Sequence, residues 1–194
     1  MNIYEHIAQM KTRVKRRDWD ALEGSYRQLC VELAGEGQAS KIASLDFSSY
    51  EDDLNRSFAE AVRQARDLNA KAVYFEYDLD NDWQANFFLC GEYNQEDLGD
   101  DDWACDWLAV VKAPAFPNAS AIYSENNFDG TATARGSTLY LIARTVASLG
   151  RCFDGYPSGD LAVCVAFHDQ DPIRRLQERS GYVLVLLEQR VQRP

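Results

Sequence analysis

The strongest strand pattern of the chain lies in residues 72–93, AVYFEYDLDNDWQANFFLCGEY. Apolar side chains recur there at every second position, which is the period of a strand with one buried face. They form two runs, Val73, Phe75, Tyr77 and Leu79, then Trp83, Ala85, Phe87 and Leu89. Turn-forming residues separate the runs at positions 80–82, so the segment predicts a β-hairpin.

The amino-terminal part has the three- and four-residue spacing of apolar side chains that is typical of helices. Such stripes run through residues 3–14 and 19–33. Asp18 is a capping residue before the second stripe, and Gly35 and Gly37 end it. The sequence therefore predicts two amino-terminal helices or one bent helix.

Two longer helices are expected on either side of the hairpin. The S-x-x-E capping box at residues 48–51 begins the first of them, its apolar stripe runs from Leu54 to Leu68, and Asn69 closes it. The second is a central helix near residues 131–149 that opens at Thr131 or Ser137. Gly150 suits the position just beyond its end.

The remaining elements are shorter. We expect a third strand at 103–109, followed by an irregular segment at 115–130 that could include a helix at 119–125. A buried strand is expected at 161–167. After it, Asp171 and Pro172 begin a short helix at 173–179, and a last strand follows at 182–187.

These elements predict one α+β domain spanning residues 1–194. Amino-terminal helices pack there with a mostly antiparallel or mixed β-sheet and the central helix. Its parts are a helical segment at 1–35, an acidic hairpin and loop at 72–111, and a helix with strands at 131–190. A length of 194 residues with 46% hydrophobic residues suits a single core.

The net charge of the chain comes from one segment. The chain has 31 acidic and 20 basic residues, for a formal charge of −11. Residues 72–111 hold eleven of the carboxylates and no Lys, Arg or His. The rest of the chain therefore has twenty acidic and twenty basic residues and no net charge. Charge this localised attracts basic partners and repels nucleic acid.

Three tryptophans lie inside the acidic segment. Aromatic anchors ringed by carboxylates are typical of a surface that binds a basic protein. We therefore predict a non-enzymatic protein that binds such a partner through this segment. The predicted partner-binding residues are Asp78, Asp80, Asp82, Trp83, Asp100, Asp101, Asp102, Trp103, Asp106 and Trp107.

The spacing of aspartates at the hairpin turn resembles the start of an EF-hand loop. That loop requires Gly at its sixth position and Glu at its twelfth, where this chain has Trp83 and Leu89. The pattern therefore fails, and no bound metal or cofactor is expected.

Two alternatives remain open. One is a metal-dependent hydrolase that uses either of two clusters, Asp78, Asp80 and Asp82, or His168, Asp169 and Asp171. The other is an orphan structural or stress protein whose acidic face keeps it in solution.

The sequence lacks the patterns of several other classes of protein. Five cysteines without a C-x-x-C pair indicate buried thiols in a reducing cytoplasm, with no zinc and no disulfide. Phosphate-binding glycine motifs and the serine hydrolase motif do not occur. The apolar runs are too short for a membrane span, and the basic run at residues 11–17 is outweighed by the acidic charge, so neither membrane nor nucleic acid is an expected partner.

The sequences VYFEYD at 73–78 and DDWACDW at 101–107, with Trp83 between them, resemble small bacterial proteins found beside polymorphic toxins as immunity proteins. The resemblance covers residues 72–107. It implies a cytoplasmic inhibitor without enzymatic activity, which masks the active site of a toxin with its acidic segment.

Overall fold

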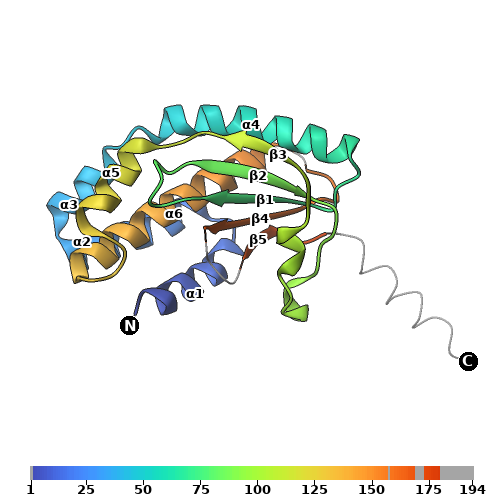
Figure 1. Cartoon of the computed structure of the whole chain (residues 1–194). Helices are drawn as coiled ribbons and strands as arrows, with labels where there is room; N and C mark the ends of the chain where they lie inside the picture. Colours follow the sequence, from blue (N-terminus) through green and yellow to red (C-terminus); the bar gives the residue numbers. More distant parts are fainter. Residues whose placement is uncertain (1, 157, 169–172, 180–194) are drawn as a thin grey trace, which may run out of the picture.

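The computed structural model describes residues 2–156, 158–168 and 173–179. These residues form an α+β fold with six α-helices and one five-stranded mixed sheet, as predicted (Figure 1). The helices are α1 (Ile3–Val14), α2 (Trp19–Ala34), α3 (Glu36–Ala43), α4 (Phe47–Asp67), α5 (Pro117–Asn126) and α6 (Ala132–Gly155). The strands are β1 (Ala72–Tyr77), β2 (Ala85–Cys90), β3 (Trp107–Ala113), β4 (Ala162–Phe167) and β5 (Arg174–Gln177).

The sheet has the strand order β3-β2-β1-β4-β5. The predicted hairpin is confirmed, since β1 and β2 pair antiparallel with Phe75 opposite Phe87. On its other side β1 pairs parallel with β4, where Phe75 lies opposite Val165. Two chain segments therefore leave the sheet at the same end, one after Tyr77 and one after Phe167.

Helices cover one face of this sheet. Val73, Phe75 and Tyr77 belong to the main core together with side chains from α1, α2, α4 and α6. Figure 1 shows α4 lying along the upper side of the sheet and α6 crossing it. The opposite face carries a smaller buried cluster that includes Tyr74, Cys164 and Trp103.

The amino-terminal predictions are confirmed with one addition. Asp18 caps α2 by accepting a hydrogen bond from the amide of Ala21 at 3.1 Å. Gly35 ends α2 with a positive φ of 87° and also begins α3, a helix that the sequence did not predict. The two glycines at 35 and 37 predict a helix end, but only Gly35 ends a helix, and Gly37 lies inside α3.

The capping box predicted for α4 is wrong. The helix begins at Phe47, and Asp46 is its cap, accepting from the amide of Ser49 at 3.1 Å. Glu51 is used elsewhere: its Oε1 accepts from the Ser148 hydroxyl at 2.7 Å and from Arg151 Nη2 at 2.7 Å. That ion pair joins α4 to α6.

Two other elements differ from the sequence prediction. The predicted helix at 173–179 is wrong, because residues from Arg174 to Gln177 form β5 against the otherwise open edge of β4. The third strand starts at Trp107 rather than 103, since Asp102–Cys105 form a 3₁₀ turn. Asp171, Pro172 and the strand predicted at 182–187 lie outside the described residues.

Candidate functional site

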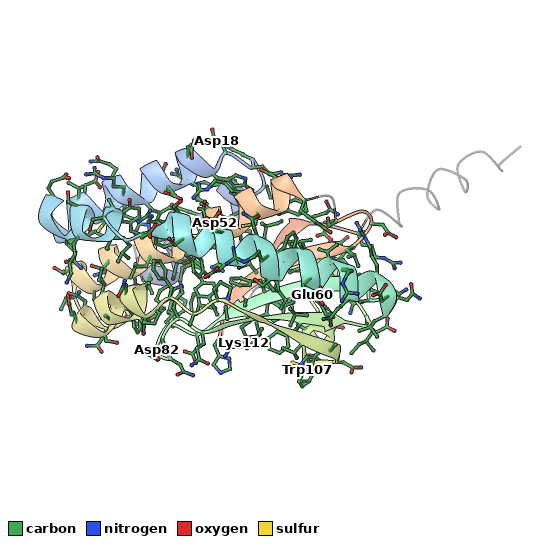
Figure 2. All side chains as sticks on the ribbon, turned by 90° about the horizontal axis from the view of Figure 1, so that it is seen from above. Asp18, Asp52, Glu60, Asp82, Trp107 and Lys112 are labelled. Carbon is green, nitrogen blue, oxygen red and sulfur yellow. The ribbon has the colours of Figure 1, made fainter. Side chains whose placement is uncertain are left out.

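The structure separates the acidic segment into two parts. Asp78, Asp80 and Asp82 belong to the turn between β1 and β2, whereas residues 91–106, which we call the acidic loop, follow β2 at its far end. A six-residue strand spans about 20 Å. Figure 2 accordingly shows Asp82 and Trp107 near opposite ends of the sheet. The ten predicted partner-binding residues therefore do not share one surface.

The three tryptophans lie in three different environments. Trp83 is fully buried in the main core, and its Nε1 donates to Thr145 Oγ1 at 3.0 Å. Trp103 is buried on the opposite face of the sheet, with its ring centroid 4.9 Å from that of Tyr93. Trp107 on β3 is 45% exposed. Of the three, Trp107 is the one available to a partner.

Basic residues of the chain neutralise part of the acidic loop. Asp101 Oδ1 lies 2.5 Å from Arg175 Nη2 of β5, and Glu96 forms ion pairs with Lys11 and Lys15 of α1. These contacts fix the loop to two distant segments. The exposed carboxylates that remain in the loop are Glu92, Asp97, Asp100, Asp102 and Asp106.

Asp101 is therefore a structural residue, and its replacement tests that role. The Arg175 side chain is 3% exposed, so Asp101→Ala removes the closer of the two carboxylates that pair with this buried guanidinium and leaves Glu178, whose Oε1 lies 3.8 Å from Arg175 Nε. We expect a loss of about 2–3 kcal/mol in the free energy of unfolding, measured by urea denaturation. The matched variant Asp102→Ala removes an exposed neighbour and should stay within about 0.5 kcal/mol of the wild type. Equal effects of the two variants would contradict this distinction.

An exposed apolar cluster follows the acidic loop on β3. It consists of Trp107, Leu108 and Val110, which are 45%, 53% and 46% exposed, and we call it the edge patch. The ring of Phe88 on β2 supports it, with centroids of Phe88 and Trp107 5.8 Å apart. Figure 2 shows the Trp107 side chain at the rim of the molecule.

Leu108 and Val110 were not among the predicted site residues. Strict alternation from residue 103 places Trp107 and Ala109 on one face. In the structure the register between β2 and β3 shifts beside Cys90, which lies opposite Trp107 while Leu89 lies opposite Ala109. Such an irregularity turns neighbouring side chains to a common side. The apolar run WLAVV was the signal that could have revealed them.

The prediction of buried thiols holds for four cysteines and is wrong for Cys105, which is exposed at the end of the 3₁₀ turn. Burial raises the pKa of Cys30 to about 11 and those of Cys90 and Cys152 to about 12. Burial also raises the pKa of Cys164 well above its ordinary value. All five thiols are free in the structure.

We expect one thiol to react with Ellman's reagent in the native protein at pH 8. The four buried thiols stay protonated and covered, and only thiolates are nucleophilic. Absorbance of the released thiol should show one fast equivalent, and the remainder should appear on addition of guanidinium. In Cys105→Ser the fast equivalent should vanish. Rapid modification of a second thiol would show that the core opens readily.

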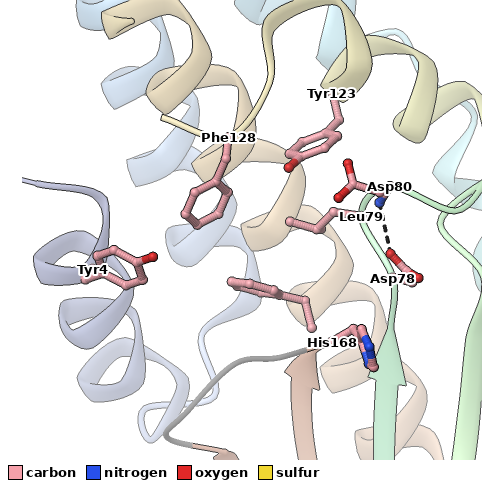
Figure 3. Close-up of a pocket in the computed structure, with 8 residues that line it drawn as sticks. Tyr4, Asp78, Leu79, Asp80, Tyr123, Phe128 and His168 are labelled. Atoms are coloured by element: carbon pink, nitrogen blue, oxygen red, sulfur yellow. Dashed lines mark hydrogen bonds between the residues drawn. The ribbon is translucent and has the colours of Figure 1, made fainter. Parts of the chain in front are cut away.

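The other end of the sheet has a pocket of about 230 Å³. Asp78 follows β1 and His168 follows β4, so the parallel pairing of these strands brings both to it. In Figure 3, Asp78 and Asp80 lie beside Leu79, and the Asp80 amide donates to Asp78 Oδ1 at 3.0 Å. The lining residues are Tyr4, Asp78, Leu79, Asp80, Tyr123, Phe128, Phe167 and His168.

The two clusters considered for a metal-dependent hydrolase thus partly meet in this pocket. Asp82 does not line it, and Asp169 and Asp171 lie outside the described residues. His168 Nδ1 is 3.1 Å from Glu76 Oε1. Within residues 2–156, 158–168 and 173–179, no group of three or more His, Cys, Asp or Glu is placed to hold a metal ion.

Comparisons with models of protein families, with curated proteins and with solved structures gave no match. In the part of the chain that the structure describes, no helix has the length and apolar character to cross a membrane.

Proposed function

We propose that this is a non-enzymatic binding protein whose edge patch and acidic loop bind a basic protein. The observation that carries the proposal is the exposure of Trp107, Leu108 and Val110 on a terminal strand of the sheet, directly after a loop of exposed carboxylates. The binding surface is thus narrower than the sequence alone predicts: it omits Trp83, Trp103 and the turn at 78–82.

The position of the edge patch supports a role in binding. A terminal strand with exposed apolar side chains invites pairing with other chains, and natural proteins usually cover or charge such an edge. Three large apolar residues exposed together on one strand are therefore explained by contact with a partner. An aromatic side chain at the centre of the contact would supply most of the affinity.

Charge selects the kind of partner. The acidic loop has no Lys, Arg or His between residues 91 and 106, and the chain carries a formal charge of −11. This field repels a second copy of the chain and any nucleic acid, and it accelerates the encounter with a basic protein. A basic protein therefore fits the surface better than a second copy of the chain or a nucleic acid.

The resemblance to immunity proteins makes a basic toxin the partner that we propose. A cytoplasmic location belongs to the same proposal, since five free thiols suit a reducing compartment. The toxin would dock its positively charged active site against the acidic loop, while the edge patch fills an apolar recess beside it.

The test compares variants in binding to one purified partner. The candidate is the toxin encoded next to this chain or, failing that, a basic protein captured on the immobilised wild type and then purified. We expect Trp107→Ala to raise the Kd at least about 30-fold, because truncation of an aromatic hot spot costs about 2 kcal/mol or more. Titration calorimetry at low salt measures the effect.

A matched pair of triple variants tests the electrostatic part. The first changes Asp97, Asp102 and Asp106 to Asn in the acidic loop, and the second changes Asp78, Asp80 and Asp82 at the opposite end. Both remove three charges. The first should slow association and flatten its dependence on salt, while the second should leave binding close to the wild type. Equal effects, or a larger effect of the second variant, would overturn the proposal, as would a stable homodimer formed through the edge patch.

A further inference from the structure

The pocket at the carboxyl ends of β1 and β4 has an aromatic wall. Four of its eight lining residues are Tyr4, Tyr123, Phe128 and Phe167. Three of these rings form a chain of contacts, with centroids of Tyr4 and Phe128 6.0 Å apart and those of Phe128 and Phe167 also 6.0 Å apart. In Figure 3, Tyr4, Phe128 and Tyr123 surround the hollow from three different segments.

Opposite this wall the pocket is negatively charged. Asp78 and Asp80 line it, and no lysine or arginine is among the eight described residues that do so. Burial raises the pKa of Tyr123, and the neighbouring carboxylates of Asp80 and Asp78 raise it further. The Tyr123 hydroxyl therefore remains protonated and can donate to a carboxylate, while the pocket as a whole favours a positive guest.

We propose that this pocket binds a small organic ammonium ion. Faces of aromatic rings attract ammonium and especially quaternary ammonium groups, and a carboxylate beside the rings adds a direct charge interaction. At about 230 Å³ the cavity is smaller than the roughly 300–1,000 Å³ typical of sites for drug-sized ligands. It suits a group of the size of a trimethylammonium or the end of a lysine side chain.

The lining distinguishes this guest from an inorganic cation. Calcium takes six to eight oxygen ligands and magnesium needs an octahedral set, whereas half of the residues around this pocket are aromatic. The site also lies at the end of the sheet opposite to the acidic loop, so it does not depend on the proposed binding of a basic protein.

The experiment follows backbone amide shifts of the full chain by NMR. Choline is the first probe, and 3,3-dimethylbutan-1-ol, which has the same shape without the charge, is its control. We expect choline to shift the amides of Leu79, Tyr123 and His168 in a saturable manner, and the alcohol to leave them unchanged. Nα-acetyl-lysine methylamide forms a second arm: tighter binding of this probe than of choline would assign the site to a lysine side chain rather than to a free amine.

Variants locate the effect. Phe128→Leu and Asp80→Asn should each weaken choline binding by roughly 2- to 30-fold, in line with the strength of cation–π and exposed ionic contacts. Asp160→Asn removes one exposed carboxylate before β4, at the other end of the sheet, and should leave choline binding unchanged. The amide spectrum of each variant reports whether it is folded.

Three outcomes would overturn the proposal: equal shifts with the neutral alcohol, no saturable shift with either ammonium probe, or displacement of choline by magnesium or calcium with tighter binding of the metal.

Discussion

Replacing Trp83 by alanine should lower the free energy of unfolding by about 3–5 kcal/mol. Trp83 is among the largest fully buried side chains of the described residues. Its ring lies against Tyr77, with centroids 5.6 Å apart, and against Tyr123 at 6.3 Å. Alanine would leave a large cavity between the hairpin turn and α6. Urea denaturation followed by circular dichroism measures the change, because this signal does not depend on the tryptophan itself.

Trp107→Ala is the matched control, since it removes the same side chain from the surface. It should cost less than about 1 kcal/mol, because Trp107 is 45% exposed. Trp83→Phe should fall between the two: it keeps most of the ring, and Thr145 still donates its hydroxyl to the carbonyl of Leu141 at 3.0 Å. A Trp83→Ala variant as stable as Trp107→Ala would mean that Trp83 is not a core residue.

The contrast between these tryptophans shows where inference from the sequence reaches its limit. Alternation of apolar residues correctly predicted both strands of the hairpin, and it places Trp83 on the same face as Phe87, which the structure buries. It does not predict the left-handed backbone of the turn, where Asp82 and Trp83 have positive φ values of 52° and 54°. For Trp107 the alternation fails, because it assigns Trp107 to the face of Ala109, and the register shift beside Cys90 interrupts that pattern.

Two further features, β5 and the pocket, depend on pairing between strands that are distant in the sequence. β5 occupies four residues that begin two positions after Pro172, a sequence typical of a short helix, and these residues form a strand because β4 offers an open edge. The pocket was likewise hidden, since only the parallel pairing of β1 with β4 places His168 beside Asp78. The separation of the two acidic clusters, by contrast, followed from the hairpin itself, whose turn and following loop must lie at opposite ends.

Gly150 was predicted to end the central helix, and the structure gives it another role. The helix α6 continues to Gly155, and Gly150 lies in its interior where the ring of Trp19 packs against the backbone. A Cβ at this position would lie 2.5 Å from Cε2 of Trp19. Because contacts under about 3 Å are severe overlaps, a larger residue forces α2 and α6 apart.

We therefore expect Gly150→Ala to destabilise the protein by about 1–3 kcal/mol, although alanine is favoured over glycine inside a helix by about 1 kcal/mol. Gly24→Ala in α2 is the matched control, since nothing lies within 4 Å of the added Cβ, and it should stabilise by about 0.5–1 kcal/mol. Urea denaturation gives both values. In the background of Trp19→Leu, which removes the ring, the penalty of Gly150→Ala should shrink markedly. If the penalty is unchanged in that background, or if both glycine variants stabilise the protein alike, then the packing of Trp19 on α6 is not what requires glycine at position 150.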